Sequence, residues 1–282
     1  MKPGNAIFSS IGTSIFEAMS ALARESDAIN LGQGFPDGNG PDDVRAVAIE
    51  ATERGPNQYP PASGTPELRQ AVAAHDKRFY GLEVDWRREV QVTCGATEAL
   101  GVCFLGLLQP GDEVVMFEPV FDTYVPMVRR AGGVPRLVRL EPPDWGVPRD
   151  SLAAAFGPKT KLLVLNSPMN PTGKVFGRDE LDFIAELALR HDAYVVCDEV
   201  YEHLLYDDLA HVPLITLPGM RERCLRIGSG GKTFSLTGWK VGFIVAAPEL
   251  LAPVSKAHQF LIFSSQPNLQ RAIAYGLGKD DA

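Results

Sequence analysis

Seven short apolar runs, separated by longer amphipathic segments, constrain the fold of this chain more than any other feature. Several runs are rich in Val, Leu and Ile, which is typical of strands covered on both faces, and segments between them such as residues 178–192 have helical apolar spacing. This alternation predicts an α/β fold, a mostly parallel seven-stranded sheet with helices on both faces. The runs, from residue 89 onward, are EVQVTC, EVVMFE, VPRLVRL, KLLVLN, AYVVCD, CLRIGS and VGFIVAA.

The region before the first run has a different character. Residues 14–25 have a helical pattern, and the stretch that follows is rich in glycine and proline and is expected to be irregular. We interpret residues 1–40 as an arm or part of a second domain, and residues 41–282 as one large domain. A length of 282 residues, 45% of them hydrophobic, suffices for a large core.

The overall charge and the cysteines narrow the choice of partner and compartment. A formal net charge of −8 at pH 7 leaves no basic surface for a polyanion, so we expect a small-molecule partner and no nucleic acid. The four cysteines show no C-x-x-C spacing, and three lie within apolar runs, which predicts buried, reduced thiols in a reducing cytoplasm. Neither a signal core nor a stretch of about twenty apolar residues is present, so no membrane contact is expected.

Polar and turn-forming residues follow the apolar runs. In sheets of this kind, ligands bind just beyond the carboxyl ends of the strands, which is where these residues lie. Asp198 ends a run, and a carboxylate there is costly unless it meets a cation or hydrogen-bond donors, so we expect it to have a charged partner. Tyr201 lies near enough to serve the same pocket. Thr97 either holds an anion at a helix N-terminus or only begins that helix, and Asn170 either holds a ligand or belongs to a proline-rich turn.

Two further patterns suggest sites and are weaker. Glu199 and His203 have the i, i+4 spacing of a metal site on a helix, but no third ligand accompanies them, so a solvated face is favoured and no metal is expected. RIGSGGKT, residues 226–233, resembles the loop that binds the phosphates of ATP. That pattern requires a leading glycine where this chain has Arg226, and no long helix follows Lys232, which disfavours a nucleotide site.

One cofactor would use all of these residue types together. Pyridoxal 5'-phosphate needs a lysine amine for a Schiff base, a carboxylate for its ring nitrogen, donors for its phenolic oxygen, an aromatic plane and a phosphate cup. The sequence offers Lys232 and Asp198 for the first two. The glycines before Lys232 would let the backbone wrap a single phosphate, and the lysine would move a proton at the substrate's α-carbon.

The chain resembles the fold-type I, class I/II pyridoxal-phosphate aminotransferases, in particular the subgroup of methionine aminotransferases and kynurenine/glutamine aminotransferases. The resemblance extends over nearly the whole chain in family order and spacing. It rests on AINLGQGFPD, NQYPPASGTPELRQAVA, TCGATEAL, GDEVVMFEPVFDTYVPM, LNSPMNPTGKVF, CDEVYEHLLYD and GSGGKTFSLTGWKVGF. It implies residues 1–40 as the N-terminal arm and first part of a small domain, and 41–282 as the large cofactor-binding domain.

The resemblance also implies roles for individual residues. Lys232 would form the Schiff base and Asp198 would pair with the ring nitrogen. Tyr201 and Asn170 would hold the phenolic oxygen, and Phe121 would stack on the ring. The phosphate would be held by Ala96, Thr97, Ser229 and Lys240, together with Tyr59 of a neighbouring subunit. The substrate would meet Gly34, Asn170, Phe16 and Phe263. A partner's Tyr59 implies a homodimer with shared active sites.

The chain departs from the family pattern in two places. Lys240 stands where many members carry arginine, which keeps the charge but gives up the bidentate fork, although the named subgroup also uses lysine there. Family members continue beyond the last residues, YGLGKDDA, into most of the small domain, which supplies the arginine that clamps the substrate carboxylate. The resemblance therefore implies that the rest of the small domain lies outside this chain.

Several functions remain open on the sequence. The first is transamination of a methionine-like or aromatic L-amino acid with a 2-oxo acid. The others are a cysteine-S-conjugate C–S lyase with the same cofactor, a cofactor-binding fragment without full activity, and a non-catalytic ligand-sensing module. No basic helix-turn-helix segment precedes Asn30, which argues against the last.

Overall fold

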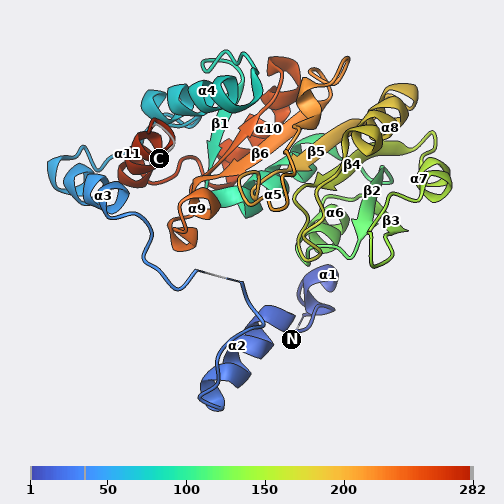
Figure 1. Ribbon diagram of the computed structural model, residues 1–282, viewed down its shortest axis with the longest axis horizontal. Helices are drawn as coiled ribbons and strands as arrows, with labels where there is room; N and C mark the ends of the chain where they lie inside the picture. The colour runs from blue at the N-terminus through green and yellow to red at the C-terminus, as the bar shows by residue number, and fades with distance from the viewer. Residues whose placement is uncertain (1, 35, 280–282) are drawn as a thin grey trace.

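The computed structural model describes residues 2–34 and 36–279. Its sheet has seven strands in the order β1-β7-β6-β5-β4-β2-β3, so the predicted α/β fold is confirmed (Figure 1). Strand β7 runs antiparallel to both of its neighbours, and the other pairs are parallel. The strands are β1 (Val90–Thr93), β2 (Glu113–Glu118), β3 (Val134–Arg139), β4 (Thr160–Asn166), β5 (Tyr194–Asp198), β6 (Cys224–Ser229) and β7 (Gly242–Val245).

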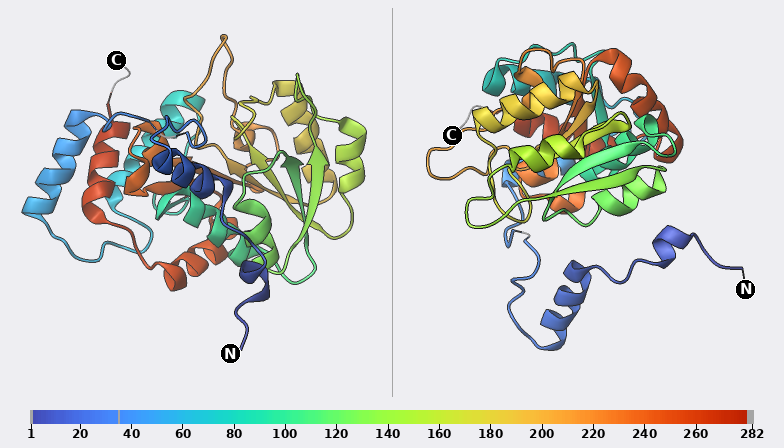
Figure 2. Two further views of the ribbon diagram at one scale, coloured as in Figure 1. Left: turned by 90° about the horizontal axis from the view of Figure 1, so that it is seen from below. Right: turned by 90° about the vertical axis from the view of Figure 1, so that its right-hand side faces the viewer.

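Helices cover both faces of the sheet (Figures 1 and 2). Helices α5 (Gly95–Leu107), α6 (Tyr124–Arg130) and α10 (Pro248–Leu261) share one apolar core with the sheet. Helices α7 (Arg149–Ala155) and α8 (Arg178–Arg190) cover the opposite face. A third core lies between strands β1 and β7 and helices α3 (Asp42–Arg54), α4 (Pro66–Tyr80) and α11 (Pro267–Leu277). The remaining short elements are η1 (Leu214–Thr216), α9 (Gly230–Thr233) and η2 (Thr237–Trp239).

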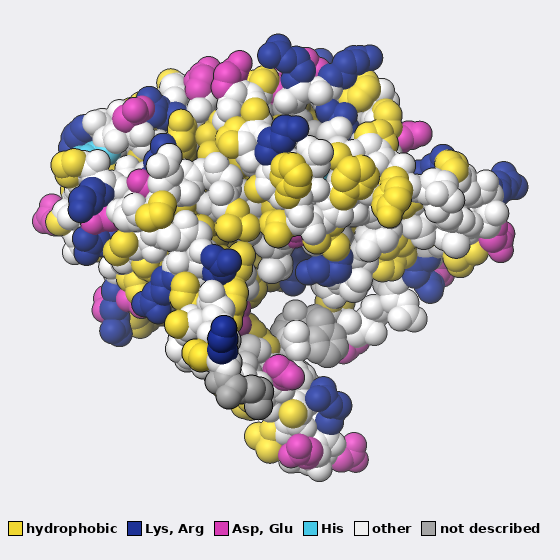
Figure 3. Space-filling model, turned by 180° about the vertical axis from the view of Figure 1, so that it is seen from behind, with side chains coloured by type: hydrophobic (Ala, Val, Ile, Leu, Met, Phe, Trp, Pro, Cys, Tyr) yellow, Lys and Arg dark blue, Asp and Glu magenta, His cyan; other side chains and the backbone are white. Residues whose placement is uncertain are grey.

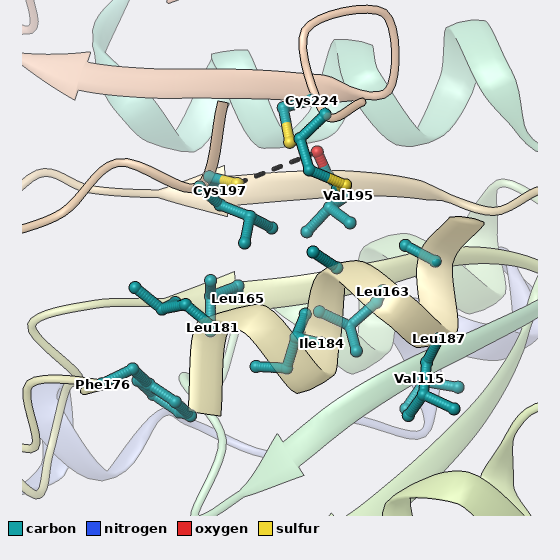
Figure 4. Packing of buried hydrophobic residues seen from close by; sticks show 14 of the residues in the cluster. Val115, Leu163, Leu165, Phe176, Leu181, Ile184, Leu187, Val195, Cys197 and Cys224 are labelled. Carbon is teal, nitrogen blue, oxygen red and sulfur yellow. Dashed lines mark hydrogen bonds between the residues drawn. The ribbon is translucent and has the colours of Figure 1, made fainter. Parts of the chain in front are cut away.

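Alternation along strand β5 divides its side chains between the two faces. Val195 and Cys197 point toward α8, whereas Val196 belongs to the core beneath α5. On α8, the buried Leu181 and Ile184 lie three residues apart and belong to the same apolar cluster as these strand side chains and as Leu163 and Leu165 of β4 (Figure 4). Each fully buried Leu or Ile contributes roughly 1.5–3 kcal/mol, so this seam fixes the position of β5 and of the residues that follow it.

The N-terminal segment projects from the body of the molecule (Figures 1–3), although its first helix contacts α6. It carries α1 (Ala6–Ser9) and α2 (Ile15–Glu25), and the Ser14 side chain accepts a hydrogen bond from the Glu17 N–H to start α2. Ile15, Met19 and Leu22 are exposed and form an apolar stripe along that helix. The assignment of residues 1–40 as an arm and the first part of a small domain remains a prediction.

The structure bears on the expectations for the cysteines and for membrane-spanning helices. Cys103, Cys197 and Cys224 are buried, Cys94 is partly exposed, and all four cysteines are free, as predicted. Among the described residues, none of the helices has both the length and the apolar character needed to cross a membrane.

Candidate active site

A cavity of about 320 Å³ opens at the carboxyl ends of strands β4, β5 and β6, beside the N-terminus of α5. Its walls include most of the residues singled out in the sequence: Phe16, Gly34, Ala96, Thr97, Phe121, Asn170, Asp198, Tyr201, Ser229, Lys232 and Lys240. The sheet brings them together because parallel strands present their carboxyl ends at one edge. We refer to this space as the active-site cavity.

Two of the expected site residues lie elsewhere. Tyr59 and Phe263 contact each other with ring centroids 5.5 Å apart and do not line the cavity. Tyr59 is 84% exposed. Their roles toward the phosphate and the substrate remain predictions.

Lys232 lies on α9, which is only four residues long and follows β6 directly. The Ser229 hydroxyl caps this helix by accepting a hydrogen bond from the Lys232 main-chain N–H at 3.3 Å. The Lys232 Nζ atom lies 5.3 Å from the centre of the Tyr201 ring. The absence of a long helix after the lysine agrees with the case against a nucleotide site.

Packing explains why glycine occurs before Lys232, and the sequence did not suggest this explanation. A Cβ atom on Gly230 would lie 2.5 Å from the side chain of Ile273 on α11. Neither Gly230 nor Gly231 has a positive φ. Gly230 is therefore required for close contact with α11, and Gly231 is the one that borders the cavity.

Asp198 ends strand β5 with its side chain buried at the base of the cavity. The Tyr124 hydroxyl donates to its Oδ2 atom at 2.5 Å, while Oδ1 has no hydrogen-bond partner among the described residues. Burial raises the pKa of Asp198 to about 6, although the hydrogen bonds from Tyr124 and the Val200 main-chain N–H act in the opposite direction. Burial also raises the pKa of Tyr124, as does the charge of Asp198, so the phenol remains a donor.

This raised pKa makes a prediction for the cofactor-free protein. Folding raises the pKa of Asp198 from 3.8 to about 6, so the folded state favours the protonated carboxyl group. The contribution of Asp198 to folding stability is therefore fully present below pH 4 and is lost as the pH rises through 6. The ionised carboxylate then costs up to about 3 kcal/mol. We expect Asp198→Asn to raise the free energy of unfolding by that order at pH 8 and to have little effect at pH 4, measured by urea denaturation.

The control is Asp182→Asn, which removes a half-exposed carboxylate paired with Arg178. Its effect should stay within about 0.5 kcal/mol at both pH values. Equal stability of wild type and Asp198→Asn at pH 8 would show that Asp198 is not buried as an ionised group.

The N-terminus of α5 and strand β7 approach each other unusually closely at the cavity wall. A Cβ atom on Gly242 would lie 2.7 Å from the main-chain carbon of Gly95, and Gly95 itself has a φ of +75°. Lys240 also adopts a left-handed conformation, with a φ of 55°, which brings its side chain against Gly95. Main-chain N–H groups of Ala96 and Thr97 and the Lys240 ammonium therefore border one end of the cavity, which suits an anion.

Two residues that organise the site were missed in the sequence. Tyr124 lies three positions after Phe121, and nothing in the pattern FDTY indicates that its hydroxyl reaches Asp198. Asn166 at the end of β4 donates to the main-chain oxygen of Asp198 at 2.8 Å and accepts from the Asn170 N–H at 2.7 Å. The position of Asn166 at the end of an apolar run could have indicated this role, since a buried amide needs hydrogen-bond partners.

A buried ionic cluster lies on the other side of the same strands, and we call it the Arg226 cluster. The guanidinium of Arg226 donates to Asp76 Oδ1 at 2.9 Å and to Glu202, and its Nε atom lies 2.8 Å from a carboxylate oxygen of Glu199. Tyr80 also donates to Glu202. Burial lowers the pKa of Arg226, but the three carboxylates raise it well above its ordinary value.

The cluster corrects one expectation about Glu199. Its side chain is only 2% exposed and lies beside Arg226 and His211, so the solvated face expected for Glu199 and His203 is wrong for Glu199. His203, by contrast, is exposed. The two side chains therefore do not form a pair on one helical face.

Comparison with known proteins extends over almost the whole chain. A sequence model of the family described as aminotransferase class I and II matches residues 26–282. The probable N-succinyldiaminopimelate aminotransferase DapC of Mycobacterium tuberculosis is 44% identical over 272 residues, which cover 96% of this chain and 68% of that protein. Methionine aminotransferase of Escherichia coli is 39% identical over 264 residues, which cover 94% of this chain and 68% of that protein.

Solved structures agree with the sequence matches. The structure of N-succinyldiaminopimelate aminotransferase from Mycobacterium tuberculosis superposes with a TM-score of 0.96 at 43% identity, covering 99% of this chain and 73% of that chain. The sequence and the overall fold both match one family. The chain belongs to the class I and II aminotransferases, pyridoxal-phosphate-dependent transaminases of fold type I.

Proposed function

We propose that this protein binds pyridoxal 5'-phosphate in the active-site cavity and transfers an amino group from a methionine-like or aromatic L-amino acid to a 2-oxo acid. The observation that carries the proposal is the unpartnered Oδ1 atom of Asp198, buried at the base of a cavity that Lys232 also lines. A buried carboxylate oxygen without a partner is costly, and a protonated ring nitrogen would satisfy it.

The remaining cavity residues fit the same cofactor. Phe121 offers an aromatic face, and Tyr201 and Asn170 offer donors for a phenolic oxygen. The phosphate would lie at the α5 N-terminus against Lys240 and Ser229. When bound, the cofactor supplies an electron sink for the carbanion formed at the substrate's α-carbon.

The protein's own side chains would control the proton and the charge. Lys232 Nζ would act as a general base that takes the proton from the substrate's α-carbon, and then as a general acid that releases it again. Asp198 would hold the ring nitrogen protonated, and Tyr124 would fix the Asp198 carboxylate through its hydrogen bond to Oδ2. Removal of the Tyr124 hydroxyl would therefore allow the Asp198 carboxylate to rotate, although Tyr124 itself would not contact the cofactor.

We infer a homodimer with shared active sites from the exposed Tyr59, which does not line the cavity of its own subunit. Tyr59 is 84% exposed and its ring stands on Phe263. A hydroxyl presented in this way suits the phosphate of a neighbouring subunit. Residues 1–40 would act as an arm of the small domain, since Phe16 and Gly34 reach the cavity from that segment.

The decisive experiment combines spectroscopy with product analysis. The purified protein is titrated with pyridoxal 5'-phosphate, and L-methionine, L-kynurenine or N-succinyl-L,L-diaminopimelate is then added with a 2-oxo acid. We expect a new visible absorbance band on binding, its loss with a preferred amino acid, and a new amino acid as product. Pyruvate and a thiol from a cysteine conjugate would instead indicate the lyase, which the two relatives described above, both named as aminotransferases, disfavour. A protein that binds the cofactor and turns over none of these would contradict the proposal.

The close approach of β7 and α5 makes a separate prediction. We expect Gly242→Ala to weaken the affinity for pyridoxal 5'-phosphate at least about tenfold, because its Cβ would meet main-chain atoms that cannot yield and would displace the phosphate-binding N–H groups. Equilibrium dialysis measures this affinity. The control is Gly157→Ala, where a Cβ meets nothing within 4 Å. Unchanged affinity of Gly242→Ala would place the phosphate elsewhere.

A further inference from the structure

A second cavity, of about 380 Å³, lies away from the active-site cavity and borders helices α4, α9 and α11. Helices α4 and α11 contact each other beside it (Figure 1). Its lining includes His75, Phe79, His203 and Thr233. Thr233 follows Lys232 directly, so this cavity begins one residue behind the proposed catalytic lysine.

The imidazoles of His75 and His203 face each other in this cavity. Their Nε2 atoms are 2.9 Å apart. Only one hydrogen atom fits between two nitrogens at this distance, so at least one of the two presents a lone pair to the other. Ligand atoms of His75, His203 and the Glu202 carboxylate all lie within 4.8 Å of one another.

A neighbouring carboxylate orients the buried member of the pair. His75 Nδ1 lies 3.1 Å from Asp76 Oδ1. An N–H at Nδ1 that donates to this carboxylate leaves the lone pair on Nε2, the atom that faces His203. Metal-binding histidines in proteins are held in the same way, with the second ring nitrogen donating to a carboxylate or carbonyl.

The charge around the pair also suits a cation. Within the Arg226 cluster, three carboxyl groups, those of Asp76, Glu199 and Glu202, surround the single guanidinium of Arg226. Two further basic side chains line the second cavity, and both are engaged. Arg78 donates to the main-chain oxygens of residues 277 and 279, and Lys279 pairs with Asp43.

We propose that His75, His203 and Glu202 bind a divalent transition-metal ion of the Zn²⁺ type, with water completing the tetrahedron. Two imidazoles and a carboxylate are a ligand set that Zn²⁺ prefers, whereas Mg²⁺ requires oxygen ligands. Two nitrogens on one tetrahedral zinc ion lie roughly 3.3 Å apart, given Zn–N bonds of about 2.0–2.1 Å. A small rotation of the exposed His203 supplies the difference. The ion would tie α4 to the segment after β5.

The test measures zinc binding to the full chain saturated with pyridoxal 5'-phosphate and dialysed against a chelator. Titration calorimetry with Zn²⁺ should give one equivalent, and Zn²⁺ should raise the melting temperature. His203→Gln keeps an amide able to hydrogen-bond His75 but removes the imidazole ligand. We expect this variant to bind Zn²⁺ at least about 100-fold more weakly and to lose the thermal shift.

Control measurements decide between a metal site and a hydrogen-bonded pair. His191→Gln removes an imidazole that follows α8 and does not line the second cavity, and this variant should bind Zn²⁺ like the wild type. Mg²⁺ should give no binding heat. Equal zinc affinity in His203→Gln and wild type, or no zinc binding by the wild type, would overturn the proposal and leave the two histidines as a hydrogen-bonded pair.

Discussion

Replacement of Lys232 by alanine is expected to lower kcat for transamination by at least about 10³-fold, because one amine both anchors the cofactor and moves the proton at the α-carbon. The visible absorbance band that accompanies cofactor binding should disappear in the same variant. Both effects follow from the position of Lys232 on the wall of the cavity at whose base Asp198 lies. The measurements are steady-state kinetics at saturating amino acid and an absorbance titration with pyridoxal 5'-phosphate.

Two other lysines serve as comparisons. Lys256 is exposed and contacts Gln259, so Lys256→Ala should leave both measurements unchanged. Lys240→Ala should weaken cofactor affinity and preserve the absorbance band at saturation, since we expect it to bind the phosphate only. A Lys232→Ala protein that retains more than a tenth of the wild-type kcat would refute the assignment of the catalytic lysine.

Replacement of Arg226 by methionine is expected to destabilise the protein by about 3–5 kcal/mol, since it leaves buried carboxylates without their counter-ion. Burial raises the pKa of Glu202, but the charge of Arg226 and the other neighbours, including the hydrogen bond from Tyr80, together hold the pKa below its usual value. Without the guanidinium, the pKa of Glu202 should rise. The loss of stability should therefore be larger at pH 8 than at pH 5, as measured by chemical denaturation.

An exposed arginine provides the matched control for this variant. Arg190 pairs with Glu186 one helical turn away, and both side chains are more than half exposed. Arg190→Met should change the free energy of unfolding by no more than about 0.5 kcal/mol. If the two methionine variants were equally stable, the Arg226 cluster would not be the buried network described above.

The sequence predicted the sheet and most of the cavity for a common physical reason. Most of the strands are buried apolar runs that can be recognised locally, although β3 is mostly exposed and β7 runs antiparallel to its neighbours. The polar residues that follow the parallel strands share one edge of the sheet. Lys232 and Asp198 were found in this way. Their roles rest on resemblance to a family and stay predictions until cofactor binding is measured.

The residues that escaped prediction depend on partners far along the chain. Arg226 lies within an apolar run and was considered only as a break in a phosphate-binding loop. Its role depends on Asp76, 150 positions earlier in the sequence. Tyr124 likewise reaches Asp198 across 74 positions. Local spacing contains no trace of such contacts, because only the folded sheet brings the partners together.

The adjacent carboxylates after strand β5 have a consequence for insertions and deletions. Asp198 faces the active-site cavity, and Glu199, one residue later, enters the Arg226 cluster on the other side. A strand slipped by one position turns every side chain to the opposite face. Losing a single residue from the connection between α8 and β5 would move Glu199 to the position of Asp198 at the cavity and Asp198 to the position of Cys197 in the apolar core beneath α8, so natural length variation should be confined to loops that leave the register of this strand untouched.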